Sequence, residues 1–346
     1  MIYEILINLT LMKMKKTLIV LSAIKIKKII FLLFAFNIYS HADLTREFPS
    51  YSYVLNEFDL DSSYIHNQEF QNFVYKNKDM YRERFRVAVG RGQLIVPTMK
   101  EMMYKSGITP LFLYLSMTES AFKTQAKSTS KAGGLWQFMA PTGREQKLTI
   151  NETIDERYDP IKSTYAAVDY LYKIRDGLDK WYLAAMAYNC GQGCVKRAVK
   201  KAGTKDLATL INPRDAFLPA ETRKYIKKIL LFSMIGENYL FKRDNNLGEA
   251  IYRMNKDSLT PVRLRGGDNL QQLASMLRMD YRVLKRTNMH LKRDFVPQGS
   301  NVMVNIPTSK LNMFRAVYNR NINQNYVNNR RDNGANRVAS NQYRIY

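Results

Sequence analysis

Glu119 is the residue of this chain best placed for acid chemistry. It stands near the end of an apolar segment, LFLYLSMTES, at residues 111–120, where a helix is expected. Apolar neighbours and the carbonyl end of a helix both disfavour a negative charge. The pKa of the Glu119 carboxyl should therefore be raised, so that it stays protonated near neutral pH and acts as a general acid on a glycosidic oxygen. The alternative is an exposed glutamate at a helix end with no chemical role.

The only two cysteines, Cys190 and Cys194, stand in the segment AYNCGQGC at residues 187–194. Their spacing differs from the two-residue gap of thioredoxin-like pairs, and no zinc-ligand spacing or phosphate-binding loop is present. We therefore expect no metal and no cofactor. A disulfide between them is possible, because residues one helical turn apart approach the Cα separation that a disulfide allows.

Four segments give the chain a family resemblance. In order they are LSMTESAF at 115–122, AGGLWQFM at 132–139, AYNCG at 187–191 and PAETRKY at 219–225. Together they resemble the four ordered motifs of the soluble lytic transglycosylase (SLT) domain family, over roughly residues 95–235. The closest subgroup resembles the membrane-bound lytic murein transglycosylase D type, whose members carry C-terminal LysM modules. Each motif alone would be weak, whereas four in this order are specific.

The resemblance implies a lysozyme-like fold and a single catalytic carboxyl, that of Glu119. In the family this group protonates the oxygen between N-acetylmuramic acid (MurNAc) and N-acetylglucosamine (GlcNAc), and then removes a proton from the muramic C6 hydroxyl. The product is a 1,6-anhydro ring, so that no water is consumed. The residues themselves indicate only that a second carboxylate, which ordinary glycoside hydrolases need, is not evident. Glu221 opens the fourth motif and has no such role in the family.

Two other functions remain open. A muramidase similar to goose-type lysozyme also relies on one main glutamate, but it would hydrolyse the same bond. A non-catalytic scaffold that binds the wall through its module and its charge is the second alternative.

The resemblance also assigns substrate contacts, to Ser120, Gly134, Gln137, Tyr188, Asn189 and Tyr225. Tyr188 and Asn189 would hold an N-acetyl group, and Tyr225 would contact the catalytic carboxyl. A glycine at 134 lets the backbone turn tightly and approach the glycan. Tyr188 and Tyr225 could instead be interior tyrosines. The third motif departs from the family pattern at Cys190 and Gln192, where alanine and glutamate are common, and neither position carries the reaction.

Helical periodicity predicts a mainly α fold between residues 68 and 245. Two helices are expected within 68–106, interrupted near Gly90–Gly92, and the segment before them, 43–67, has no sustained helical period and is predicted to be extended. Asp159-Pro160 and Leu218-Pro219 are typical of helix starts. Further helices are expected at about 135–146, 160–176, 180–189 and 220–239.

Five regions follow from these patterns: a signal peptide (1–42), a partly helical N-terminal extension (43–94), the SLT domain (95–245), a LysM-like βααβ module (259–308) and a disordered basic tail rich in Asn and Arg (311–346). In the module, Gly267-Asp268-Asn269-Leu270 stands where LysM has its GDTL-type turn. The module is predicted to hold glycan, and the alternative is a packing role only.

The N-terminus and the charge indicate where the protein acts. Lysines precede a short apolar run, IIFLLFAFNIY, which ends in Ser40-His41-Ala42, the order of a cleaved secretory signal, and the run is short for a membrane span. The net charge is +24. Polyanions are the expected partners of so basic a chain, and in the periplasm these are peptidoglycan strands or a membrane surface rather than nucleic acid. We expect a monomer.

Overall fold

The structure is a computed structural model of the 346-residue chain, and it describes residues 43–241 and 257–318. The predicted signal peptide lies outside the described residues. The chain divides into two compact units, residues 1–49 and 50–346. The described part of the first contains the short helix α2 (Leu44–Glu47), where the Asp43 side chain accepts a hydrogen bond from the amide of Thr45. Among the residues described, no helix is both long and apolar enough to cross a membrane.

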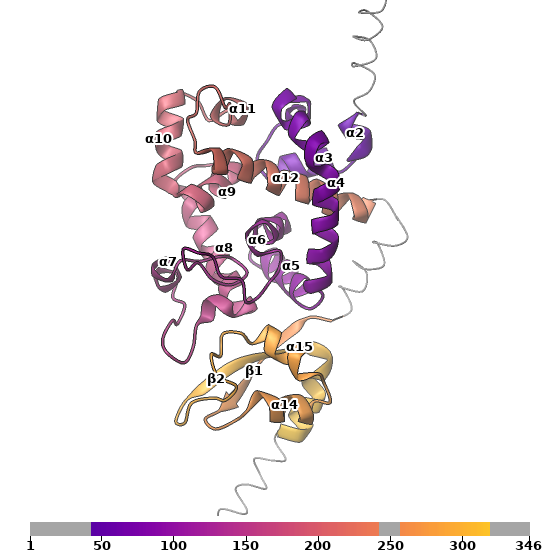
Figure 1. Cartoon of the computed structure of the whole chain (residues 1–346), viewed down its shortest axis with the longest axis vertical. Coiled ribbons are helices and arrows are strands. Elements are labelled where there is room, and N and C mark those ends of the chain that lie inside the picture. The colour runs from indigo at the N-terminus through magenta and orange to yellow at the C-terminus, as the bar shows by residue number, and fades with distance from the viewer. Residues whose placement is uncertain (1–42, 242–256, 319–346) are drawn as a thin grey trace, which may run out of the picture. The chain divides into compact units, whose positions relative to one another are not determined.

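The second unit begins with a region of helices (Figure 1). Its elements are α3 (Tyr51–Glu57), η1 (Ser62–His66), α4 (Gln68–Arg91), α5 (Ile95–Lys105), η2 (Pro110–Phe112), α6 (Leu113–Ser120), α7 (Ala140–Glu145), η3 (Glu156–Tyr158), α8 (Pro160–Asp176), α9 (Trp181–Cys190), α10 (Gln192–Ala202), α11 (Leu207–Leu210) and α12 (Ala220–Phe241). The long helix α12 packs against α4, α6 and α9. The mainly helical fold predicted from the sequence is confirmed.

Helix α6 lies in the middle of these helices (Figure 1), and most of its first five residues are apolar. Residues 113–117 are all buried. The hydroxyl of Tyr114 donates a hydrogen bond of 2.7 Å to the Glu237 carboxylate on α12. A side chain at Gly236 would collide with that tyrosine, since an added Cβ would lie 2.1 Å from its hydroxyl oxygen. The glycine therefore lets α6 and α12 approach closely enough to be joined by this buried bond.

Two local expectations are wrong. Residues 51–57 and 62–66, predicted as extended, form α3 and η1, because buried residues such as Val54, Leu55 and Ile65 have tertiary partners that a short segment does not reveal. The helix expected from 135 begins only at Ala140, because Gly134 and Gln137 have φ of +79° and +49°, outside the helical region. The sequence also did not predict α10 or α11.

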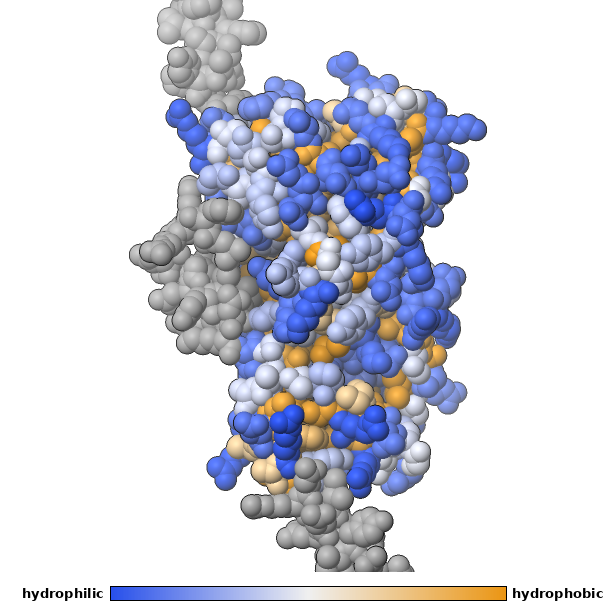
Figure 2. All heavy atoms as spheres, turned by 180° about the vertical axis from the view of Figure 1, so that it is seen from behind, coloured by the Kyte–Doolittle hydropathy of each residue, from blue (hydrophilic) through white to orange (hydrophobic). Residues whose placement is uncertain are grey.

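Hydrophilic side chains cover most of the face seen in Figure 2, with hydrophobic residues showing between them. Large apolar residues with considerable exposure are few, and include Met80 and Val87 on α4 and Tyr104 on α5. Scattered single apolar residues are normal on a protein surface. Val87 differs because it lines the cleft described below.

The C-terminal region has the βααβ order predicted from the sequence: β1 (Leu259–Arg265), α14 (Leu270–Met276), α15 (Tyr281–Thr287) and β2 (Asn301–Pro307), followed by η4 (Thr308–Lys310). The two strands are antiparallel, with Val262 opposite Val304. Residues 311–318, predicted as part of a disordered tail, are helical. Phe314 is the reason, because its side chain is buried in the same core as Leu264 and Ile306.

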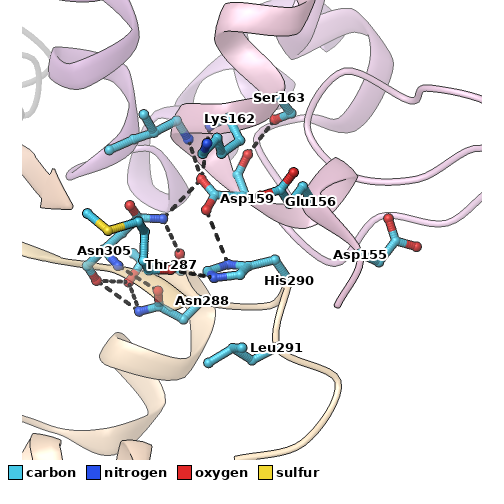
Figure 3. A network of polar contacts seen from close by, with 12 residues as sticks. Asp155, Glu156, Asp159, Lys162, Ser163, Thr287, Asn288, His290, Leu291 and Asn305 are labelled. Carbon is cyan, nitrogen blue, oxygen red and sulfur yellow. Dashed lines mark hydrogen bonds and ion pairs between the residues drawn. The ribbon is translucent and has the colours of Figure 1, made fainter. Parts of the chain in front are cut away.

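A buried polar network joins this module to the SLT-like helices (Figure 3). Asp159, just before α8, accepts a hydrogen bond of 3.1 Å from the Asn305 amide on β2. His290 lies beside the same carboxylate, with Nδ1 3.4 Å from Oδ2, and its Nε2 contacts the Met303 carbonyl at 3.0 Å. The Asp155 amide donates to the His290 carbonyl. The module is therefore attached through specific, buried polar contacts.

Candidate active site

A cleft of about 410 Å³ opens beside Glu119. Its walls come from three elements far apart in the sequence, namely α4, the end of α6 with the residues after it, and α12. The lining residues are Tyr81, Glu83, Arg84, Val87, Arg91, Met117, Thr118, Glu119, Ser120, Ala121, Lys123, Lys228 and Phe232. Of the site residues predicted from the sequence, Glu119 and Ser120 line this cleft, and the others are not among its lining residues.

Glu119 occupies the last turn of α6, as the apolar segment predicted. The helix ends at Ser120, and the next two residues, Ala121 and Phe122, have positive φ, of 49° and 57°. Two successive non-glycine residues in the left-handed region are uncommon and cost free energy, and such strain clusters at functional sites. Phe122 is fully buried, which holds the turn in place. The chain therefore leaves α6 abruptly, one residue after the carboxyl-bearing position.

Burial raises the pKa of the Glu119 carboxyl from 4.5 to about 7. The hydrogen bond from Tyr225 and the positive charge of Lys228 act in the opposite direction, while Glu221 raises the pKa further. The loss of hydration therefore exceeds the stabilisation that nearby donors and cations give to the carboxylate. A group with this pKa is present in both protonation states near neutral pH, as an acid that later acts as a base requires.

Tyr225 on α12 is the direct hydrogen-bond partner of Glu119. Its hydroxyl donates to Oε1 of that carboxyl, and its side chain is buried. Burial, and then the neighbouring Glu119, raise the pKa of the Tyr225 phenol well above its usual value. The phenol therefore keeps its proton and fixes the orientation of the carboxyl.

Tyr188 and Asn189 lie at the end of α9 and are used partly for internal contacts. The Tyr188 hydroxyl donates to the Trp136 carbonyl at 2.8 Å, and its pKa is raised well above normal by burial and by Glu119. Asn189 accepts a hydrogen bond of 2.7 Å from the Thr222 hydroxyl on α12. Its amide nitrogen makes no hydrogen bond to any residue that the structure describes, and is thus available as a donor.

The loop around Gly134 packs closely against the backbone of Arg157 and is stabilised by hydrogen bonds to its own carbonyl groups. A side chain at Gly134 is excluded, because an added Cβ would lie 1.8 Å from the carbonyl oxygen of Arg157. The side-chain amide of Gln137 donates hydrogen bonds to the carbonyls of Ala126 and Gly134, at 3.2 and 2.8 Å. Ser120 donates to the Ser116 carbonyl one turn earlier. In this structure the side chains of Ser120 and Gln137 therefore form hydrogen bonds with the backbone, and a direct contact of either with substrate stays a prediction.

Cys190 and Cys194 form a disulfide, with their Cα atoms 5.8 Å apart. The bridge joins the last residue of α9 to the first turn of α10, across Gly191. It follows directly after Asn189 and closes the turn between the two helices.

Sequence motifs did not identify the opposite wall of the cleft, formed by α4 and part of α12. Arg84, Val87 and Arg91 share one face of α4, at spacings of three and four residues. That spacing was visible in the sequence, but nothing local indicated that this face would meet the end of α6. Lys123 and Lys228 complete the cationic part of the lining.

Comparison with known proteins finds a family match over part of the chain. The family model "Transglycosylase SLT domain" matches residues 97–211. The chain contains an SLT transglycosylase domain. The predicted fold class is thereby confirmed for this region, while the LysM-like assignment of 259–308 lies beyond the match and stays a prediction. Helices α4 and α12, which complete the cleft, also lie outside the matched residues of the SLT domain.

Individual proteins are similar to parts of this chain. Membrane-bound lytic murein transglycosylase D of Escherichia coli (strain K12) is 29% identical over 205 residues, which are 58% of this chain and 43% of that protein. A putative tributyltin chloride resistance protein of Alteromonas sp. (strain M-1) is 38% identical over 94 residues, 26% of this chain and 44% of that protein. The chain thus spans less than half the length of these relatives.

Two solved structures are also similar, each with a TM-score of 0.35. An inactive mutant of the lytic transglycosylase Slt from Pseudomonas aeruginosa is 23% identical and covers 40% of this chain and 23% of its own. The 70 kDa soluble lytic transglycosylase of Escherichia coli is 20% identical and covers 42% and 24%.

Proposed function

We propose that this protein is a lytic transglycosylase that cleaves the MurNAc-β-1,4-GlcNAc bond of peptidoglycan in cell-wall remodelling. The observation that carries the proposal is Glu119, whose carboxyl lines a cleft and has a pKa raised to about 7 by burial. The SLT domain and the lytic murein transglycosylase relative support the substrate class.

The protonated Glu119 carboxyl donates its proton to the glycosidic oxygen, the bond from this oxygen to the muramic C1 breaks, and GlcNAc leaves as an alcohol. Glu119 is now a carboxylate. It removes the proton of the muramic C6 hydroxyl, whose oxygen bonds to C1 and closes the 1,6-anhydro ring. The carboxyl ends as it began, protonated, and no water is consumed.

Neighbouring residues support both halves of this cycle. The Tyr225 hydroxyl donates to Glu119 and holds it in one orientation. Tyr188, on which the charge of Glu119 acts, and its neighbour Asn189 would bind the N-acetyl group, and hydrogen bonds with Trp136 and Thr222 hold them in place. No second carboxylate is needed, and Glu221, which is exposed on α12, only raises the pKa of Glu119.

The protein acts on the wall from the periplasm in this proposal. The leader predicted at 1–42 supports export, and a Cys190–Cys194 disulfide suits an oxidising compartment. The module at 259–308, with its own hydrophobic core, is proposed to hold glycan strands. We infer that the protein works as a monomer and without a cofactor.

Digestion of purified peptidoglycan by wild type and Glu119→Gln, with mass spectrometry of the products, tests the function. We expect 1,6-anhydro-muramic ends from the wild type and almost none from the variant. Reducing muramic ends would instead assign a muramidase, and equal, slow clearing by both proteins would indicate a non-catalytic scaffold. Glu101→Gln is the matched control, since Glu101 is an exposed glutamate on α5 paired with Lys105.

A further inference from the structure

The lining of the Glu119 cleft includes four cations, from Arg84 and Arg91 on α4, Lys123 after α6, and Lys228 on α12. We call these four residues the cationic wall. Two acidic residues line the same cleft. Glu83 is paired with Arg86 at 2.8 Å, and Glu119 has a raised pKa. The cleft therefore has an excess of positive charge directly beside the proposed catalytic carboxyl.

The cations of this wall form no hydrogen bond or ion pair with a carboxylate among the residues described. Lys123 and Lys228 form no hydrogen bond or ion pair with any residue in the described ranges. Arg84 lies 5.7 Å from the centre of the Tyr81 ring, and Arg91 reaches only the Ala121 carbonyl, at 3.5 Å. Elsewhere in the same helices, Lys227 is bonded to Glu69 at 2.6 Å. Hydrophilic residues cover much of the surface (Figure 2). The wall differs in that its cations form no ion pair with any described residue, although the charges of Glu221 and Glu119 act on Lys228 to raise its pKa.

Holding Lys228 in this position is unfavourable without an anion. Its side chain is half-buried, and burial, followed by the charge of Lys224, lowers its pKa. A carboxylate bound in the cleft would reverse both effects, because an opposite charge a few ångströms away favours the charged form of the lysine. The electrostatics of the wall therefore favour the binding of an anion.

The cleft also has an apolar part. Tyr81, Met117, Val87 and Phe232 line it beside the cations. Its volume of about 410 Å³ is in the range of small-molecule sites. The ligand expected here combines carboxylates with short apolar groups. It must be attached close to the glycosidic bond whose oxygen Glu119 protonates. The acidic peptide that substitutes the muramic residue of peptidoglycan has this chemistry.

We propose that the cationic wall binds the carboxylates of this peptide, so that the protein prefers peptide-bearing glycan strands. This inference rests on the proposed function and specifies the substrate of the same site. The wall would act mainly on binding and positioning of the strand, while Glu119 performs the chemistry.

The test compares two substrates and two double variants. The substrates are soluble, uncross-linked peptidoglycan strands and the same strands with their carboxylates converted to amides. Arg84→Gln/Lys123→Gln removes two charges of the wall and leaves Lys228, which bears on the pKa of Glu119, in place. Arg197→Gln/Lys200→Gln removes two exposed charges from α10, which does not line the cleft.

For the wild type and the α10 variant, we expect kcat/KM to fall about tenfold or more when the carboxylates are amidated, since charge-assisted hydrogen bonds are lost. The wall variant should lose a similar factor on the native strands and little more on the amidated ones. Circular dichroism and thermal unfolding establish that both variants fold. Equal cleavage of the two substrates by the wild type, or an equal loss for the wall variant on both, would overturn the inference and leave the proposed function intact.

Binding separates the two proposals. If the wild type cleaves neither substrate, the proposed function fails, and equilibrium binding of both strands to the wild type and to the wall variant still tests the wall. Tighter binding of the native strands by the wild type alone, weakened by added salt, supports the inference. Equal binding of both strands contradicts it.

Discussion

Glu119 and Asp159 are both carboxyls withdrawn from bulk water at an end of a helix, but Glu119 ends α6 whereas Asp159 begins α8. Asp159 accepts hydrogen bonds from the amides of Ile161 and Lys162, at 2.8 and 3.0 Å, and from Asn305 on the module. Glu119 accepts one, from Tyr225. Two differences therefore distinguish a carboxyl suited to a structural role from one suited to proton transfer. They are which end of the helix the carboxyl occupies and how many hydrogen-bond donors reach it.

Removing the Glu119 carboxyl should have the largest effect on activity and little on folding. Glu119→Gln can still accept the Tyr225 hydrogen bond, but it has no proton to exchange. We expect kcat to fall by roughly 10²–10⁴-fold, the usual contribution of general acid-base catalysis. Anhydro-end formation measures the loss, and thermal unfolding at neutral pH should show no decrease in stability. A variant that keeps most of its activity would contradict the assignment.

Removing the Asp159 carboxyl should lower stability and leave activity nearly unchanged. Asp159→Ala removes the cap of α8, leaves the buried amide of Asn305 without this acceptor and removes the carboxylate beside His290 (Figure 3). We expect a loss of about 2–4 kcal/mol in the free energy of unfolding, with near-normal kcat below the unfolding temperature. Denaturant titration measures it. Asp280→Ala is the control, because Asp280 caps α15 at an exposed position and should cost about 1 kcal/mol. Equal losses of stability for Asp159→Ala and Asp280→Ala would contradict the special structural role of Asp159.

The raised pKa of Glu119 predicts a pH dependence of stability that Glu119→Gln lacks. The folded state holds the proton up to a pKa of about 7, while the unfolded value is 4.5. The stabilisation is therefore complete below pH 4.5 and is lost as the pH rises through 7, by roughly 3 kcal/mol relative to the variant. Unfolding of both proteins across this range measures the difference. A wild type that gains stability over the variant in this window would show that the pKa is lowered instead.

Tyr225→Phe removes the one hydrogen bond that the Glu119 carboxyl accepts, and so widens its difference from Asp159. Because this hydrogen bond lowers the pKa of Glu119, its loss should move that pKa above 7 and shift the corresponding limb of the pH-rate profile upward. Loss of orientation should also lower kcat by about tenfold, as for a hydrogen bond to a charged group. A shift toward lower pH would contradict the account.

The smallest effect on activity is expected at the disulfide. Replacing Cys190 and Cys194 by serine removes the constraint on a very short loop, which should cost about 2 kcal/mol of stability in the chain-entropy picture. The pH-rate profile should not move, because neither cysteine contacts Glu119. Denaturant titration and the pH-rate profile together test this. A shift in the profile would place the α9–α10 turn in the catalytic machinery.

Local sequence signals predicted some of these features and could not predict others. The apolar run before Glu119 predicted both its helix end and its raised pKa, and Asp159-Pro160 predicted the start of α8. The partners of Asp159 could not be predicted, since Asn305 lies 146 residues further along the chain. The left-handed turn at Ala121 and Phe122 carries no glycine to indicate it. The cationic wall was missed because three separate elements meet only in the folded chain.

The most direct test of the central claim is digestion of peptidoglycan by the wild type in water enriched in heavy oxygen, with mass spectrometry of the new muramic ends. One carboxyl that acts first as acid and then as base predicts 1,6-anhydro ends that contain no oxygen from the solvent. Ends that carry the heavy oxygen would show that water, and not the C6 hydroxyl, attacks the muramic carbon, and would contradict the account.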